Sequence, residues 1–180
     1  MGRSVGRGDK LEKQMLRYTL EKMDRMGALL QCNREVNPEY EMGAVLKHFR
    51  NKRPIVFNKV KSSPYKVAGG LYGDREIIYK LLDMNHENRL FKFMDAIANP
   101  RPYKIVNNGP VKENIIRGNI DIGKLFPIPK FQEKDSSSFI TAGVMVIKDP
   151  ETGKYFTSIR RFQINGGNQL SALIASPKLT

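Results

Sequence analysis

The feature that most constrains this fold is a pair of strand-forming segments close to the end of the chain. Residues 139–148 read FITAGVMVIK, residues 149–153 form the turn DPETG, and KYFTSIRRFQI follows at 154–164. Only one further candidate strand, 169–175, comes after them. Three strands cannot close a barrel, and the open edges of a sheet pair readily with other chains. The sequence therefore predicts an incomplete β-barrel in a protein that works as a subunit.

Helix and strand signatures alternate through the first hundred residues, which favours an α/β layer. Strand-like apolar runs lie at 28–33, 54–60 and 66–68. Beyond residue 111 the pattern changes to strands and proline-containing loops. The expected organisation is a disordered N-terminus, an α/β domain and a partial barrel segment, at residues 1–9, 10–108 and 109–180.

Apolar residues at helical spacing predict which helix faces are buried. The first helix is expected to begin near Asp9 and to end at Gly27, and the third to be capped by Asp74. Four apolar stripes are expected to face the core. They are Leu16, Leu20 and Met23; Met42, Val45, Leu46 and Phe49; Ile77, Ile78, Leu81 and Leu82; and Leu90, Phe91, Met94 and Ile97.

A glycine-rich turn, with Gly69, Gly70 and Gly73, precedes the helix capped by Asp74. Such a turn can hold phosphate on free backbone N–H groups. The spacing G-G-x-x-G lacks the full dinucleotide motif and has no Lys-Ser/Thr sequel. A tight turn that requires glycine is the favoured explanation, with a phosphate site as the alternative.

The chain is strongly basic, with a formal net charge of +13 at pH 7, and it has no acidic residue between Met42 and Gly73. Such charge raises nucleic acid, an anionic membrane or an acidic protein as candidate partners. The stretch from Lys47 to Lys66 can equally be a solvated basic face. The sequence offers no aromatic stacking platform of the RNA-recognition type and no zinc-finger spacing, which argues against nucleic acid.

Cys32, His48 and His86 are the only cysteine and histidines, so no metal-ligand cluster and no internal disulfide framework is expected. Each is interpreted as structural. The N-terminal MGRSVGRGDK lacks the apolar core of a signal peptide, and no apolar run is long enough to cross a bilayer. A cytoplasmic location without a membrane partner is expected.

Six stretches resemble the UbiD family of prenylated-flavin-dependent (de)carboxylases, in that family's order. They are REVNPEYE, PIVFNKV, VAGGLYGDRE, IDIGKLFPIPKF, DSSSFITAGVMVIKDPETG and SIRRFQI. The likeness runs from Met15 to the last residue and covers the N-terminal portion of a typical member. It implies an α/β domain followed by a split barrel of the flavin-reductase-like type that holds the cofactor, in agreement with the pattern above.

The resemblance also implies site residues. The family places an arginine of its proton-transfer network in the pattern Asn, any, small, Ile, any, Arg, and Arg161 matches that arginine. Ser158 and Ile159 match the backbone neighbours of the flavin phosphate. Arg161 can instead be an edge-strand residue that discourages aggregation or pairs with a partner. Because Arg160 and Arg161 alternate along a strand, at most one of them faces a flavin pocket.

The departures from the family pattern are informative. Phe156 stands where the family has a metal-binding asparagine, and its ring offers no oxygen ligand to a hard cation. Leu179 stands where a histidine follows Pro177 by two residues. The glutamates of the network would lie beyond Thr180. We therefore expect this chain alone to hold neither metal nor flavin and not to be catalytic.

The sequence thus predicts a small UbiD-like subunit of a multi-subunit aromatic acid carboxylase or decarboxylase. Its partner would be a full-length catalytic homologue that holds prenylated FMN and a divalent metal, together forming a hetero-oligomer. The alternative is a composite site in which Arg161 and the Ser158 backbone touch a flavin held mainly by that partner.

Overall fold

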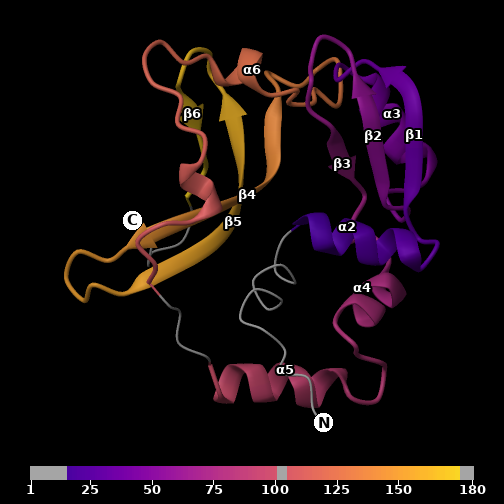
Figure 1. Ribbon diagram of the computed structural model, residues 1–180, viewed down its shortest axis with the longest axis vertical. Coiled ribbons are helices and arrows are strands. Elements are labelled where there is room, and N and C mark those ends of the chain that lie inside the picture. Colours follow the sequence, from indigo (N-terminus) through magenta and orange to yellow (C-terminus); the bar gives the residue numbers. More distant parts are fainter. Residues whose placement is uncertain (1–15, 101–104, 175–180) are drawn as a thin grey trace. The chain divides into compact units, whose positions relative to one another are not determined.

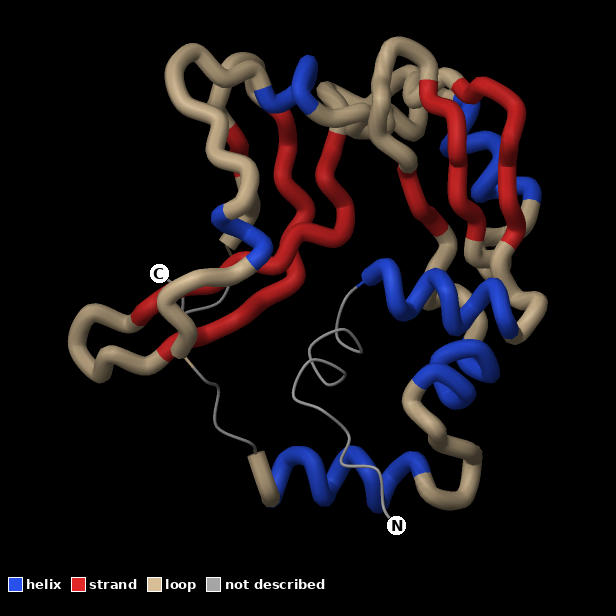
Figure 2. The backbone as a smooth tube through the Cα atoms, viewed as in Figure 1, coloured by secondary structure: helices blue, strands red, loops and turns tan. Residues whose placement is uncertain are grey.

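The computed structural model describes residues 16–100 and 105–174 (Figure 1). Within them the chain forms two separate three-stranded sheets and several short helices (Figure 2). The chain divides into two compact units. Among the described residues, one contains 16–33, 46–57, 68–100 and 105–113, and the other contains 34–45, 58–67 and 114–174. The mixed α/β character predicted from the sequence is confirmed, and no closed barrel is found among the described residues.

The first sheet has the order β1-β2-β3, with bounds Leu30–Val36, Ile55–Val60 and Val67–Gly69. Its central strand β2 is the core of this part of the molecule, because Ile55, Val56 and Phe57 are all buried. Consecutive buried side chains point to opposite faces of a strand, so both faces of β2 are covered. The strand that the sequence predicts at 54–60 is confirmed.

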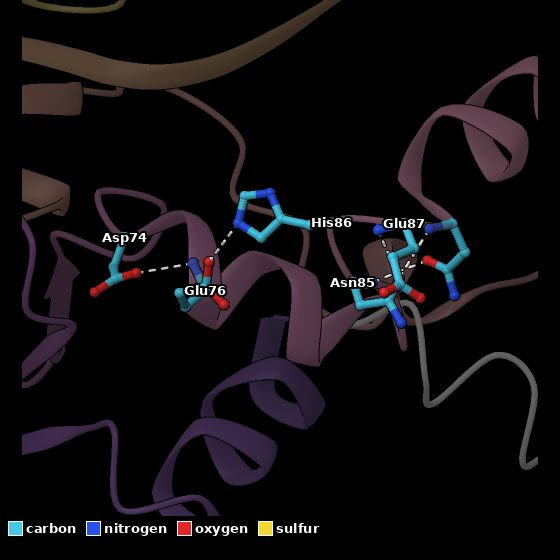
Figure 3. Close-up of polar contacts among 6 residues, drawn as sticks. Asp74, Glu76, Asn85, His86 and Glu87 are labelled. Atoms are coloured by element: carbon cyan, nitrogen blue, oxygen red, sulfur yellow. Dashed lines mark hydrogen bonds and ion pairs between the residues drawn. The ribbon is translucent and has the colours of Figure 1, made fainter.

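Three helices accompany this sheet: α2 (Leu16–Arg25), α3 (Glu41–His48) and α4 (Arg75–Leu81). α2 buries Met23 and α3 buries Met42. The Asp74 carboxylate caps α4 by accepting the backbone N–H of Glu76 at 2.8 Å (Figure 3). The cap and the end of α2 before Gly27, whose φ is +66°, confirm the sequence prediction. The predicted disorder of residues 1–9 and the helix start near Asp9 lie outside the described residues.

The second predicted stripe is corrected at its end. Phe49 does not belong to the buried face of α3, because the helix ends at His48 and Phe49 is exposed. Arg50 and Asn51 adopt positive φ angles of 53° and 56°, which turn the chain out of the helical path.

The fourth predicted stripe is wrong as a core assignment. Helix α5 (Arg89–Ala98) forms where predicted, but none of its residues is buried. Phe91 is 75% exposed and Ile97 79% exposed. Helical spacing of apolar side chains predicts an amphipathic helix. Burial of its apolar face also requires a second surface, and no described residue supplies one.

The glycine-rich turn owes its composition to close packing. A Cβ added to Gly73 would lie 1.6 Å from the backbone oxygen of Asn51, and one added to Gly70 would lie 2.4 Å from that of Arg53. Gly70 also has a φ of +66°. Both positions exclude a side chain, so the tight-turn explanation accounts for these glycines.

The second sheet has the order β4-β5-β6, with bounds Phe139–Lys148, Tyr155–Ile164 and Leu170–Ser171. The predicted hairpin is therefore confirmed. The segment between residues 113 and 138 consists mostly of loops, in agreement with the proline-containing loops predicted beyond residue 111. That segment follows the 3-10 turn η1 (Pro110–Lys112) and contains the short helix α6 (Ile122–Leu125). Its prolines remove donors that a strand would need.

No helix in the described ranges has both the length and the apolar character needed to cross a membrane.

Candidate functional site

The β4–β5 hairpin carries every site residue that the family pattern predicts. The two strands pair in antiparallel register along their lengths. The register shifts by one residue between Ile140 and Gly143, which places a bulge in β4 across from Arg161. A bulge increases the local twist and redirects nearby side chains, and bulges are frequent beside functional sites.

One end of the hairpin is closed by a turn built around Asp149. Its carboxylate accepts the backbone N–H of Glu151 at 2.8 Å and the hydroxyl of Thr152 at 2.5 Å. Gly153 completes the turn with a φ of +66°, and the backbone N–H of Asp149 donates to the carbonyl of Lys154. The Thr152 hydroxyl, with the backbone N–H groups of Glu151 and Thr152, holds the pKa of the Asp149 carboxyl below its ordinary value.

The other end of the hairpin is fixed by the segment that precedes it. The Ser137 hydroxyl donates to the carbonyl of Ile164 at 2.6 Å, and the backbone N–H of Ile164 donates to Ser138. Ile164 is buried. The Phe162 ring lies directly over Gly143, since a Cβ there would be 2.4 Å from the ring. These contacts hold the site strand at the end away from the turn.

The exposed face of the hairpin is apolar around Ile159, with Arg161 at one end and Thr157 and Lys148 toward the turn. Val144, Val146 and Ile159 lie on this face, and Ile159 is 73% exposed. Arg161 follows Ile159 by two residues, so its side chain leaves the same face. A flat apolar surface beside a permanently charged guanidinium fits a planar ring that carries, or lies next to, an anionic group.

The opposite face of β5 carries Phe156, Ser158 and Arg160, with Ser158 and Arg160 half-buried. The Nε atom of Arg160 is buried and has no hydrogen-bond partner among the described residues. Family matching did not single out Arg160, because it occupies a position that the pattern leaves free. Its adjacency to Arg161 was the only signal available in the sequence.

The structure thus separates the predicted site residues between two faces. Ile159 and Arg161 share the exposed face, whereas the Ser158 side chain lies on the other. Ser158 can still contribute backbone groups to the flavin side, as the resemblance implies. Its backbone faces Met145 in the ladder.

The hairpin does not provide a metal site. Phe156 lies opposite Ile147, so two apolar residues occupy the position where an oxygen ligand is expected. Across the part of the chain that the structure describes, no group of three or more His, Cys, Asp or Glu side chains could hold a metal ion. Leu179 lies outside the described residues. The donor set present does not fit a divalent cation.

His86 and Glu76 form a second polar cluster, in which His86 Nε2 lies 3.1 Å from Glu76 Oε1 (Figure 3). The His86 ring packs edge-on against Tyr79, with ring centroids 5.2 Å apart. Asn85 accepts the backbone N–H groups of Glu87 and the residue after it. These contacts order the turn between α4 and α5, in agreement with the structural role predicted for His86.

A hollow of about 170 Å³ lies between α2 and α4. Its one cationic lining residue, Lys22, donates to the carbonyl of Leu81 at 2.9 Å and pairs with Asp83 at 3.1 Å. Most of the remaining lining is apolar or aromatic. The lining contains no carboxylate, histidine or cysteine, and its cation is already paired.

Comparison with known proteins places these features in one family. Residues 20–97 match the 3-octaprenyl-4-hydroxybenzoate carboxy-lyase N-terminal domain, and residues 104–179 match the Rift-related domain of the same carboxy-lyase. The chain is 31% identical over 157 residues to a protein encoded in the cooM 5′ region of Rhodospirillum rubrum, covering 84% of this chain and 33% of that protein.

Solved structures give the same result. The chain is similar to the UbiD-class enzyme HmfF from Pelotomaculum thermopropionicum in complex with FMN, with a TM-score of 0.85 and 36% identity over 91% of this chain and 37% of that one. HmfF has also been solved as an evolved dimeric form with prFMN. The fold of the vanillic acid decarboxylase ShVdcCD of Sedimentibacter hydroxybenzoicus, solved with a truncated ShVdcD, matches with a TM-score of 0.82 at 23% identity, covering 91% of this chain and 39% of that one. The chain spans about a third of the length of the curated relatives it matches.

Proposed function

We propose that this chain, which belongs to the UbiD family, is a UbiD-like subunit that works beside a full-length catalytic homologue. It carries the N-terminal portion of the family. The assembly would carboxylate or decarboxylate an aromatic acid. In it this chain covers a sheet edge or shapes the partner's active site. Phe156 is the observation that carries the proposal.

Phe156 argues against an independent flavin–metal site in this chain. The family pattern places a metal-binding asparagine there, and a hard divalent cation requires oxygen ligands. The phenyl ring pairs across the ladder with Ile147, so its cross-strand partner does not supply the lost oxygen. A homologue with an intact ligand set would therefore hold the metal in the assembly.

The exposed hairpin face supports a second candidate function, a composite flavin site. Ile159 and Val144 would lie against the ring of a flavin, and backbone groups of Ser158 would lie beside its phosphate. When bound, the modified flavin supplies an electron sink for the loss of CO₂. This chain would add shape, exclusion of water and one positive charge.

Arg161 would hold the substrate carboxylate in this composite site. The planar fork of an arginine side chain can bind a carboxylate through two parallel, charge-assisted hydrogen bonds. The side chain is exposed on the face of Ile159, so it can reach a group brought by another subunit. Holding the carboxylate against the apolar face would orient the bond that breaks.

Co-purification tests the subunit proposal. The chain is purified under gentle conditions from its own cells, and the native mass and the bound flavin are measured. We expect a particle that contains a larger UbiD homologue together with flavin. A stable monomer that binds FMN and a divalent metal by itself would contradict the proposal.

Turnover of the complex separates the two roles. The composite site predicts that Arg161→Ala lowers turnover by roughly two orders of magnitude or more, because a transition-state contact is lost. Arg117→Ala, which removes an exposed guanidinium outside the hairpin, serves as the matched control. Equal turnover of both variants would eliminate the composite site and leave the purely architectural role.

A further inference from the structure

Arg160 is the one described residue with a buried side-chain nitrogen or oxygen that lacks a hydrogen-bond partner. The atom is Nε of a guanidinium that stays charged. Buried polar groups in native proteins are almost always hydrogen-bonded, and a charged donor without an acceptor is especially costly. The position therefore calls for an acceptor that the folded hairpin does not provide.

That acceptor does not come from either strand of the hairpin. Neither β4, FITAGVMVIK, nor β5, YFTSIRRFQI, contains an aspartate or glutamate. Arg160 lies opposite Gly143, which has no side chain to offer. Two consecutive arginines thus occupy a ladder without carboxylates, which is a local excess of positive charge suited to an anion.

The neighbours of Arg160 on its own face indicate which kind of anion. Ser158 precedes it by two residues and lies on the same face, roughly 7 Å away along the strand. A hydroxyl and a guanidinium at this spacing both donate to phosphate oxygens. Phe156 continues the same face and supplies no oxygen for a metal ion, so a phosphate here would have to be neutralised by side chains.

We infer that Arg160 binds the phosphate of a flavin mononucleotide and supplies the positive charge that a metal ion cannot supply beside Phe156. The inference rests on the proposed function, because that function brings a flavin to this hairpin. It assigns different tasks to consecutive residues: Arg160 holds phosphate on one face of β5, and Arg161 is available to a carboxylate on the other face, where the ring would lie. The flavin would pass from one face to the other around the edge of β5 that no described strand pairs before Gln163. Phosphate recognition in this chain is therefore independent of divalent metal.

The Nε–H signal of Arg160 tests this directly. Arginine Nε–H resonances of the 180-residue chain are recorded by heteronuclear NMR in buffer with a metal chelator, and Arg160→Met identifies the relevant signal. We expect saturable shifts of this signal with inorganic phosphate in the isolated chain and with FMN once the partner subunit is present, and none with riboflavin, which lacks the phosphate. Arg117→Met is the matched control and should leave the responsive signal in place.

Binding to the assembled complex provides a second readout. In metal-free buffer, Arg160→Met should weaken FMN binding at least about tenfold while riboflavin binding stays unchanged, because only FMN offers the charged acceptor. Arg160→Lys keeps the charge but lacks Nε, so it should show an intermediate loss. If Arg160→Met fails to fold, this lysine variant carries both measurements.

Two results would overturn the inference while leaving the proposed function intact. One is an Arg160 signal that ignores phosphate and FMN in a chain that still assembles with its partner. The other is a signal that shifts on addition of the partner subunit alone, which would assign the acceptor to a protein carboxylate. Conversely, a phosphate response in a chain that never finds a partner would support the inference and count against the proposed function.

Discussion

Gly73 provides a quantitative test of how the α/β part is packed. Its ideal Cβ would lie 1.6 Å from the backbone oxygen and 2.6 Å from the carbonyl carbon of Asn51, and 3.0 Å from Cα of Lys52. Ordinary contact begins near 3.4 Å, so Gly73→Ala requires the two backbones to separate by about 1.8 Å. All three atoms belong to main chain, which cannot rotate aside as a side chain can.

The cost follows from what that separation disturbs. Asn51 and Lys52 are held by backbone hydrogen bonds from their N–H groups to Leu46 and Phe49, at 2.9 and 3.0 Å. Overpacking costs about 1–3 kcal/mol, and weakening one such bond adds about 1 kcal/mol. We therefore expect Gly73→Ala to lower the free energy of unfolding by about 3 kcal/mol, or the Tm by about 6–12 °C for a chain of this size.

Two other glycines distinguish the cost of a steric clash from the cost of a positive φ. Gly27 has a φ of +66° but open space around its Cβ position, so Gly27→Ala should cost only about 1–2 kcal/mol. Gly109 has open space and no positive φ, so Gly109→Ala should stay within about 0.5 kcal/mol of the parent. Urea unfolding of the three variants, with and without phosphate, gives the comparison. A Gly73→Ala variant as stable as Gly109→Ala would refute the packing argument, and a phosphate-dependent difference would revive the phosphate-site alternative.

Three further substitutions probe the core and the two carboxylates whose pKa values are lowered. Phe57→Ala should lower the unfolding free energy by about 3–5 kcal/mol in urea titration, because the ring is fully buried. The backbone N–H of Asn37 lowers the pKa of Glu41 in the folded state. The ionised Glu41 carboxylate therefore stabilises the fold above its unfolded-state pKa, and this stabilisation is lost as the pH falls through its folded-state pKa. The Tm of Glu41→Gln should therefore fall less on acidification than the Tm of the parent. Asp149→Asn should likewise reduce the fall of Tm at acidic pH, because the Thr152 hydroxyl and nearby backbone N–H groups lower the pKa of the Asp149 carboxyl.

Local sequence was sufficient to predict the hairpin. The turn DPETG provides its own hydrogen bonds through Asp149, and a glycine occupies the position with positive φ. The flanking apolar strands need only each other to form a ladder. The cap at Asp74 was predictable for the same reason, since a cap depends on residues within one turn of helix.

Burial was less predictable because it depends on a second surface. Helix α5 has the apolar spacing of a core helix, yet Phe91 and Ile97 are exposed in the described structure. Phe49 continues an apolar stripe but follows the helix end, where Arg50 and Asn51 take positive φ. For α5 the pattern identified an apolar face and left its partner undetermined, whereas at Phe49 it extended the apolar stripe past the end of the helix.

Arg160 and Arg161 lie on opposite faces of β5, and only Arg161 occupies a position of the family pattern. The family pattern identified Arg161 from the serine and isoleucine that precede it. Strand alternation places Arg160 and Arg161 on opposite faces but does not predict which of the two is half-buried. The contacts of Ile164 and Phe162 decide this, because they orient the strand so that Arg160 lies on the side of Gly143. The bulge across from Arg161 then lies at the point where the two faces diverge.

The loss of an oxygen ligand at residue 156 and the presence of Arg160 on the same strand face are best understood together. A phosphate monoester carries close to two negative charges near neutral pH and must be neutralised wherever it is desolvated. If an apolar residue removes the metal, a cation has to reach the same phosphate from a nearby position on that face. Alternation along β5 puts Arg160 on the required side, and its uncompensated Nε is the donor that such a phosphate would satisfy. Restoring both missing ligands by Phe156→Asn with Leu179→His should therefore place the two cations in competition, so the Arg160 Nε–H response to FMN in the complex should weaken when divalent metal is added to that variant and remain unchanged in the parent.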